Sequence, residues 1–389
     1  MATEFTLGIE EEYQIIDPVT RELRSGIDDL MGERNDDDEV TLQVELHKSV
    51  VEVATGICAD IQQARQEVLA NRRRAARIAE RVGLRIAAAA THPIARWQDQ
   101  DLSIGPTYDR LVNDLQDVAR ANLIFGLHVH VGIPDRDEAI AIFNSARYFL
   151  PHVLALSTSS PFFEGRRSGL KSMRSLIFER LPRTGIPERF SSYREFETFV
   201  ALLVKTGCID SGKRIWWDLR PHPSFSTLEF RVCDLPTRAD DVIAIAALLQ
   251  ALVARLARVH RGNMAWNDHR SALLRENKWR ALRYGLEGHL IDFGRQSEVP
   301  FADLVEELLE LVDDVVDELG TRAEMDHIRR IVAEGTSADH QLRIFEESGG
   351  NLEAVVDWLI EETMVGVPRL EALNGGRHPD AAPGTEASS

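Results

Sequence analysis

Hydrophobic and polar residues alternate in several short segments of the first half of the chain. In residues 5–16 (FTLGIEEEYQII), apolar and β-branched residues alternate in part with charged ones, which predicts a strand. Asp60 is placed to cap a helix that runs to about Val82, and Asp135 to cap another that runs to about Leu156. An irregular stretch is expected after the second helix, up to Gly212. Related patterns predict strands over 41–55 (one long strand or a pair), 84–90, 123–133, 215–220 and 227–234.

The second half of the chain has the 3.6-residue periodicity of helices. Its last residues, 374–389, are rich in Gly, Pro, Ala and Ser, and we predict a disordered tail there. Strands followed by a run of helices indicate an α+β fold rather than alternating βαβ units. We therefore predict one domain over 1–373, strand-rich to about 235 and helical from about 236. The helices are expected at about 240–261, 302–319, 323–334, 338–347 and 351–364.

Composition narrows the classes of protein that this chain can belong to. The formal net charge of −18 argues against nucleic-acid binding, which depends on Lys and Arg at phosphates. We expect no secretory signal and no membrane span, because neither a basic, apolar leader nor a long apolar run is apparent. The three cysteines, Cys58, Cys208 and Cys233, form neither a disulfide framework nor a CxxC pair, so a cytoplasmic location is predicted.

Candidate chemistry begins in the first predicted strand. Alternation places Glu10 and Glu12 on one face and Glu11 on the other. Two neighbouring carboxylates on one face repel each other unless a cation lies between them. The alternative is an exposed acidic strand edge. The flanking Leu7 and Ile9 indicate a partly buried strand and weaken that alternative.

Three further segments carry charged or metal-binding side chains among apolar residues. Glu45 and Glu52 lie in the second segment, QVELHKSVVE. His128 and His130 share a face of a strand, as ligands or as histidines hydrogen-bonded inside a sheet. In the last segment, TLEFRV, Glu229 and Arg231 also share a face, and a plain ion pair between them is possible.

Taken together, these segments supply five strand-borne carboxylates, two imidazoles and an arginine. Buried carboxylates in that number need cations, and oxygen-rich ligand sets suit Mg²⁺ or Mn²⁺ better than zinc. Divalent ions beside a positioned arginine are what phosphoryl transfer from a nucleotide requires. The segment GCIDSGK (207–213) is not a P-loop, because Arg214 replaces the required Ser or Thr and a strand pattern follows.

Seven sequence blocks together resemble the carboxylate–amine ligase family, also called glutamate–cysteine ligase type 2. They occur in order from residue 8 to about residue 293, and DLRPHPSFSTLEFRVCD is the most specific. The blocks are GIEEEYQIID (8–17), ELHKSVVEVATG (45–56), GLHVHVGI (126–133), SSPFFEGR (159–166), LPRTGIPERF (181–190), DLRPHPSFSTLEFRVCD (218–234) and ENKWRALRYG (276–285).

The resemblance implies a glutamine synthetase-like catalytic fold, a curved antiparallel sheet with helices on its outer face. Its concave face would hold ATP and two or three divalent metals. Arg231 would contact the phosphates and, with Glu229, form the catalytic pair. His130 is a candidate nucleotide, substrate or second-sphere group, and Arg220 a candidate anion contact unless it pairs with Asp218 or another acid. The metal ligands implied are Glu10, Glu12, Glu45, Glu52, His128 and Glu229.

The function implied is an ATP-dependent ligase that forms an amide through an acyl phosphate. Glutamate is the expected carboxylate, an amine such as cysteine or another amino acid the acceptor, and a homodimer the expected assembly. Because water competes with the amine, covering loops are expected, at 91–120 and 159–190. Two alternatives remain at this point, a guanidino kinase with Cys233 as its reactive thiol, and a non-catalytic nucleotide- or metal-binding protein.

Overall fold

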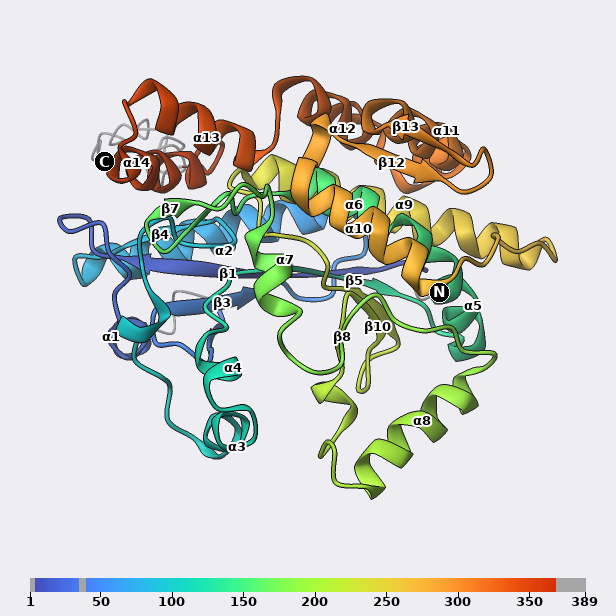
Figure 1. Ribbon diagram of the computed structural model, residues 1–389, viewed down its shortest axis with the longest axis horizontal. Coiled ribbons are helices and arrows are strands. Elements are labelled where there is room, and N and C mark those ends of the chain that lie inside the picture. The colour runs from blue at the N-terminus through green and yellow to red at the C-terminus, as the bar shows by residue number, and fades with distance from the viewer. Residues whose placement is uncertain (1–3, 35–39, 369–389) are drawn as a thin grey trace, which may run out of the picture.

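The computed structural model describes residues 4–34 and 40–368 of the chain. The tail predicted at 374–389 lies outside the described residues. Within the described ranges, helices and an antiparallel sheet are arranged in layers (Figure 1), so the predicted α+β class is confirmed.

The main sheet crosses the middle of the molecule. Its strand order is β10-β11-β5-β1-β3-β2, with β4 also paired to β1, and every pairing is antiparallel. The strands are β1 (Leu7–Ile16), β2 (Leu42–Val44), β3 (Val50–Ala54), β4 (Arg85–Ala87), β5 (Leu127–Gly132), β10 (Leu219–Pro221) and β11 (Thr227–Phe230). Three small two-stranded sheets accompany it: β6 (Phe162–Phe163) with β7 (Arg166–Arg167), β8 (Thr184–Gly185) with β9 (Trp216–Trp217), and β12 (His289–Asp292) with β13 (Ser297–Pro300).

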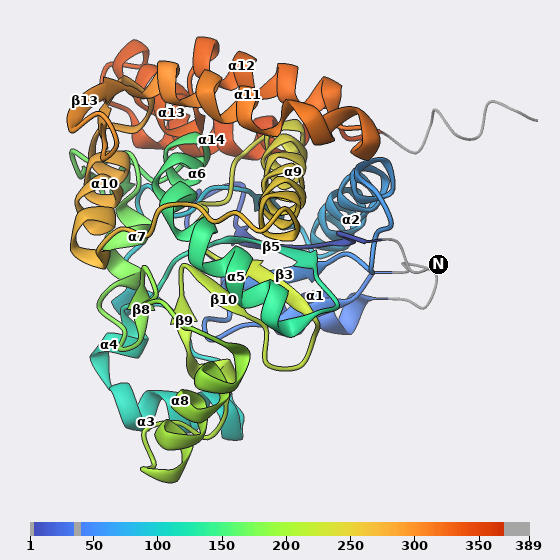
Figure 2. The ribbon, with the colours of Figure 1, turned by 90° about the vertical axis from the view of Figure 1, so that its right-hand side faces the viewer.

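Two layers of helices cover one face of the sheet. The long helices α2 and α9 lie directly on it, and α11 and α12 lie on α9 (Figure 2). The helices of the first half are α1 (Ile27–Glu33), α2 (Ile61–Arg81), α3 (Pro106–Leu115), α4 (Asp117–Arg120), α5 (Arg136–Ala146), α6 (Leu150–Ser157), α7 (Met173–Phe178) and α8 (Tyr193–Lys205). Those of the second half are α9 (Ala239–Arg261), α10 (Ser271–Tyr284), α11 (Phe301–Leu319), α12 (Arg322–Glu334), α13 (Ser337–Glu347) and α14 (Leu352–Thr363).

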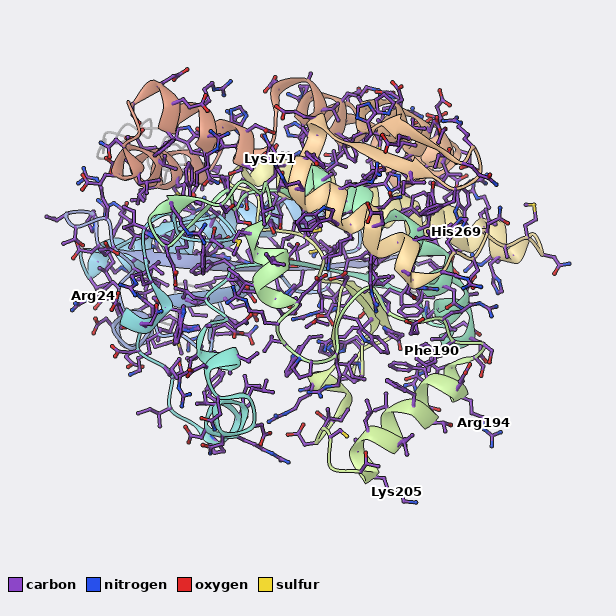
Figure 3. The ribbon with its side chains drawn as sticks, in the orientation of Figure 1. Arg24, Lys171, Phe190, Arg194, Lys205 and His269 are labelled. Carbon is purple, nitrogen blue, oxygen red and sulfur yellow. The ribbon has the colours of Figure 1, made fainter. Side chains whose placement is uncertain are left out.

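The opposite face of the sheet carries shorter elements. Helices α3, α4 and α8 extend away from it, on the side where the helical layers are absent (Figure 1). Phe190 is buried and packs on Phe196, Phe199 and Trp217 at the base of α8, whereas Arg194 and Lys205 project outward (Figure 3). This face is therefore bordered by projecting arms and left open between them.

Two stretches pass a length-and-composition test for crossing a membrane, Arg136–Ser157 and Ala239–Arg261. Their most apolar windows are 78% and 83% buried inside the molecule. Such burial is typical of the core helices of a folded domain.

The helix expected from Asp135 to about Leu156 is present as one helical run of α5, a 3-10 turn at Arg147–Phe149 and α6, and Asp135 caps its start as predicted. Two other expectations about local elements are corrected. The stretch expected to be irregular contains α7 and α8. Between 262 and 301, where no element was predicted, lie α10 and the β12–β13 hairpin.

Candidate active site

Strand β1 has two chemically different faces. Leu7, Ile9 and Tyr13 are buried in the core beneath the helices, and Glu11 lies on the same side in an ion pair with Arg72. Glu10 and Glu12 point to the open face, as alternation predicted. Register then places other charged side chains beside them, because Glu12 is paired with Glu52 on β3 and Glu10 with His128 on β5.

Glu10 is held between the two predicted histidines. Its Oε2 lies 3.0 Å from Nδ1 of His128, and its Oε1 lies 3.1 Å from Nε2 of His130. Burial opposes ionisation of Glu10, yet the histidine contacts outweigh it and hold the pKa of this carboxyl well below its usual value. Burial and the charge of Arg231 lower the pKa of His128 to about 4. A neutral His128 that donates Nδ1–H to Glu10 keeps Nε2 free to bind a metal.

Glu12, Glu45 and Glu52 form a second group of carboxyls. Burial and the charge of Glu45 raise the pKa of Glu12 to about 7. Burial and the charges of Glu45, Glu10 and Glu12 raise the pKa of Glu52 to about 10. The common cause is that burial and the neighbouring carboxylates outweigh the opposing charges of Arg174 and Arg231. A bound cation would remove that conflict.

Two sets of three ligand atoms lie close enough to hold a metal ion. In each set the atoms are within 4.8 Å of one another, and the sets are Glu10, His128 and Glu229, and Glu12, Glu52 and His128. Carboxylate oxygens with one imidazole fit Mg²⁺ or Mn²⁺. The structure thus brings together five of the six predicted metal ligands in these sets. The sixth, Glu45, lies on the same cavity.

Glu229 is shared by two arginines. Arg220 binds it in a bidentate way, with Nε 2.6 Å from Oε2 and Nη2 3.1 Å from Oε1, and Arg231 donates from Nη1 to Oε1. Nη1 of Arg220 also donates to the carbonyls of Lys213 and Ile215. The donors of Arg220 are thus largely satisfied within the protein. Arg220 therefore forms an ion pair with an acid of the protein, which was the alternative to contacting an anion, and the acid is Glu229 rather than Asp218.

His130 lies behind Glu10. Its Nε2 contacts Glu10 and its Nδ1 lies 3.1 Å from the hydroxyl of Thr227. His130 does not itself line the cavity. Its contacts are those of a residue that positions Glu10.

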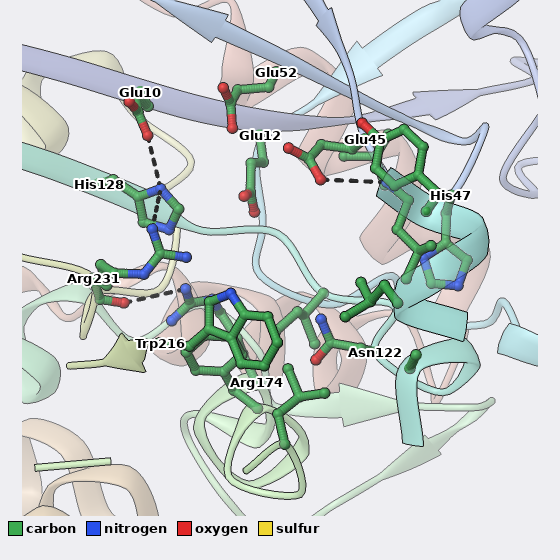
Figure 4. A pocket seen from close by; sticks show the side chains of 18 of the residues that line it. Glu10, Glu12, Glu45, His47, Glu52, Asn122, His128, Arg174, Trp216 and Arg231 are labelled. Atoms are coloured by element: carbon green, nitrogen blue, oxygen red, sulfur yellow. Dashed lines mark hydrogen bonds and ion pairs between the residues drawn. The ribbon is translucent and has the colours of Figure 1, made fainter. Parts of the chain in front are cut away.

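These residues border a cavity of about 260 Å³ on the open face of the sheet (Figure 4). One wall carries the glutamates, and the facing wall includes Arg231, Arg174 and Trp216. Sequence reasoning missed Arg174, which lies in a segment without a periodic pattern. Other lining residues that it missed are Tyr108, Leu111, Asn122, Phe178, Leu181 and His222.

Both predicted covering segments contribute to the cavity. Tyr108 and Leu111 come from α3, in the segment 91–120, and Phe178 comes from α7, in the segment 159–190. They are partly helical rather than loops throughout. Ion pairs tie α3 to the segment that leads into β9, since Arg214 lies 3.1 Å from Asp114 of α3 and Arg110 of α3 lies 3.4 Å from Asp210.

Cys233 does not line the cavity. Its side chain is fully buried in the core, and burial raises the pKa of its thiol to about 12. A guanidino kinase would need a reactive thiol at the guanidinium site. Cys233 therefore does not meet the requirement of the guanidino kinase alternative.

Known proteins resemble the chain over most of its length. The sequence profile of the glutamate–cysteine ligase family 2 matches residues 6–357. A protein of Solibacter usitatus is 52% identical over 96% of this chain and 97% of its own length. One of Sorangium cellulosum is 54% identical over 94% of this chain and 97% of its own. Both carry the provisional name glutamate–cysteine ligase 2.

Solved structures share the fold at low sequence identity. A glutamate–cysteine ligase of Francisella tularensis in complex with AMP has a TM-score of 0.66 at 12% identity, covering 95% of this chain and 90% of its own. A bifunctional glutathione synthetase of Pasteurella multocida also has a TM-score of 0.66, at 14% identity, covering 96% of this chain and 54% of its own.

Proposed function

The chain belongs to glutamate–cysteine ligase family 2, so it is an ATP-dependent ligase that forms C–N bonds, and we propose that it joins the side-chain carboxylate of glutamate to an amine. One observation carries the proposal. Several buried carboxylates and an imidazole share a cavity with two buried guanidinium groups. That arrangement suits a nucleotide triphosphate, whose anionic oxygens need both metal ions and arginines.

The residues of the glutamate wall are proposed to hold Mg²⁺ or Mn²⁺. We assign Glu10, His128 and Glu229 to one ion, Glu12, Glu52 and His128 to another, and Glu45 to the same region. When bound, the ions offset the negative charge of the phosphate oxygens. His130 holds Glu10 in place, and Arg220 holds Glu229.

Arg231 is proposed to stabilise charge on the phosphoryl group during transfer. In the first step an oxygen of the substrate carboxylate attacks the γ-phosphorus, and ADP leaves. In the second, a neutral amine attacks the acyl carbon, phosphate leaves and the nitrogen loses a proton. The acyl phosphate must be kept from water between the steps. The side chains of Tyr108, Phe178 and Trp216 cover part of the cavity and support that requirement.

Two further expectations from the sequence are part of this proposal. Small-molecule substrates follow from ligase chemistry. The cytoplasmic location and the homodimer remain predictions. Sedimentation velocity of the full chain checks the assembly, with a twofold mass over the 43.7 kDa chain as the expected result.

The activity is tested by offering substrates directly. The protein is incubated with ATP, Mg²⁺ and glutamate, and cysteine, other amino acids and simple amines are added one at a time. We expect ADP release together with a new amide detected by mass spectrometry. Glu229→Gln should abolish turnover. It should also lower the unfolding temperature, because Arg220 and Arg231 lose their carboxylate partner, so activity is compared at a temperature at which the variant is folded. ADP formed only with guanidino compounds, or no ADP with any acceptor, would contradict the proposal.

A further inference from the structure

Arg174 is a buried cation on the wall of the cavity. It lies in α7, and only 2% of its surface is exposed. Its guanidinium contacts the backbone of Arg231, and it lines the cavity together with Trp216 (Figure 4). It also stacks on Phe178, with its Cζ 5.5 Å from the ring centre.

The hydrogen bonds of Arg174 leave part of its guanidinium without a partner. Nη2 donates to the carbonyl of Arg231 over 3.2 Å, and Nε has no partner although it is buried. Among residues 4–34 and 40–368, no ion pair is formed by Arg174, whereas Arg220 and Arg231 both bind Glu229. The carboxylates of Glu12, Asp218 and Asp234 act on the charge of Arg174 without forming an ion pair with it. Buried donors without a partner are costly, so an anion from outside the chain would satisfy them.

The backbone around Arg174 is fixed from behind. Its N–H donates to the hydroxyl of Ser160, and the helix that carries it is capped by Ser172. Both hydroxyls also donate to Asp234, each over 2.7 Å. Asp234 is buried and anchors the start of the helix, and its charge also interacts with that of Arg174. The guanidinium is thus held by rigid elements before any ligand arrives, which lowers the cost of binding one.

Gly126 shows how close Arg174 lies to the candidate metal ligands. A Cβ at this glycine would lie 2.5 Å from Nη2 of Arg174 and 3.2 Å from Nε2 of His128. Its N–H donates to Glu12. The guanidinium, the imidazole shared by both ligand sets and a carboxylate therefore converge at one point of the backbone. An anion that reaches both a metal on His128 and Arg174 fits the phosphoryl oxygens of the nucleotide.

We infer that Arg174 binds the terminal phosphoryl group of ATP, the group that is transferred. The inference rests on the proposed function for the identity of the nucleotide. The sequence suggested Arg220 as the residue that contacts an anion. The inference gives that role to Arg174 instead.

Calorimetric titration tests this role without turnover. The ligands are AMP, ADP and the non-hydrolysable β,γ-imido analogue of ATP, each with Mg²⁺. In Arg174→Gln we expect the affinity for the triphosphate analogue to fall at least about tenfold, since a charge-assisted hydrogen bond is lost. The affinity for AMP should change less than about twofold. For Arg174→Lys, the affinity for the triphosphate analogue should lie between those of the wild type and Arg174→Gln. Lysine keeps the positive charge but not the forked arrangement of donors.

Two further variants control for the environment of Arg174. Gly126→Ala crowds the guanidinium without changing any charge, and it should also weaken binding of the triphosphate analogue. Arg183→Gln neutralises an arginine that stacks on Trp216 but does not line the cavity, and it should leave all three affinities unchanged. Unfolding temperatures show whether each variant is folded.

The outcomes separate this role from the proposed function. Equal loss of affinity for AMP and the triphosphate, no loss in folded Arg174→Gln, or an effect confined to the KM of glutamate would each overturn it. If the wild type binds the triphosphate analogue but forms no amide, the proposed function fails. The comparison of Arg174→Gln with the wild type then still decides the role of Arg174.

Discussion

At the scale of single residues, the surroundings of Glu52 strongly disfavour the ionised form of its carboxyl group. Burial and three neighbouring glutamates raise its pKa to about 10, and the pKa of Glu12 is raised to about 7. The pKa of an unfolded glutamate is close to 4.3. Without metal the folded protein therefore binds more protons than the unfolded chain above that value, and its stability falls as pH rises.

We expect the metal-free protein to lose stability between pH 7 and pH 9. For each carboxyl group with a raised pKa, the free energy of unfolding falls by at most about 1.4 kcal/mol per pH unit. The histidines with lowered pKa, such as His128, add no slope there, because they are neutral in both states. Glu52→Gln should flatten this dependence and be more stable than the wild type at pH 9 in EDTA. It should also lose most of the stabilisation that Mg²⁺ gives the wild type.

Urea unfolding at both pH values, in EDTA and in MgCl₂, measures these effects. Glu347→Gln, at the exposed end of α13, serves as the control and should behave as the wild type. A wild-type stability that does not change from pH 7 to pH 9 in EDTA would contradict the pKa assignments.

Simple alternation was enough to predict which residues share a face. It placed Glu10 with Glu12 and His128 with His130, because strand periodicity is a local property of the backbone. It could not choose the acid that binds Arg220, since register across β10 and β11 decides that contact. Arg174 was also beyond it, because its position depends on the packing of a six-residue helix, α7, against strands far away in sequence.

At the scale of elements, β1 is held by an ion pair on the face opposite the site. Arg72 of α2 donates to Glu11 over 2.6 and 3.0 Å. The same guanidinium donates to the carbonyls of Pro236, Thr237 and Thr363. One side chain therefore joins α2, β1, the start of α9 and the end of α14.

Arg72→Met should destabilise the protein strongly. Removing one partner of a buried pair leaves the other charge uncompensated, a loss of about 3–5 kcal/mol. The double variant Arg72→Met/Glu11→Gln removes that charge and keeps an acceptor for the hydroxyl of Tyr13, so it should recover part of the loss. Urea denaturation of the two variants and the wild type provides the comparison. Equal stability of the single and double variants would show that no charge was left unpaired.

Helix signals in the sequence differed in clarity from one element to another. The caps Asp60 and Asp135 were predicted, and both side chains accept from a backbone N–H three residues on. Helix α8 carries an apolar pattern in Phe196, Phe199, Val200 and Leu203 that could have been recognised. Helix α10 gives a weaker signal, because its buried face includes the polar Asn277 and Lys278.

At the scale of the whole molecule, ion pairs join two segments that border the cavity, helix α3 and residues 210–216, called the two arms below. Arg214, only 11% exposed as a side chain, binds Asp114 of α3 and Asp210, and Arg110 lies 3.4 Å from Asp210. Tyr108 and Trp216, which line the cavity, belong to the two segments that these pairs connect. The pairs therefore help to keep the arms together over the site.

Replacing Arg110 and Arg214 by Gln should loosen this connection. Water would then reach the acyl phosphate more often, so ADP release without an added amine should rise relative to amide formation. High salt should have the same effect on the wild type, because it screens exposed ion pairs. The ratio of ADP to amide, measured by mass spectrometry, reports both effects. An unchanged ratio in the folded double variant would show that the arms close without these pairs.

The order of elements along the chain predicted the class of the fold but not its layers. Strands come first and helices later, which indicated α+β. That α11 and α12 lie on α9 rather than on the sheet depends on contacts between distant segments. The division of 1–373 into one domain with two halves stays a prediction.

The register of the sheet has a consequence for how preparations of this protein can be judged. A slip of β1 by one residue would turn Glu10 and Glu12 into the core and Glu11 out of reach of Arg72. Such a slip would take Glu10 out of one ligand set and Glu12 out of the other, so neither set would be complete. Each molecule is then fully competent or inert, and specific activity becomes a count of correctly paired sheets in the sample.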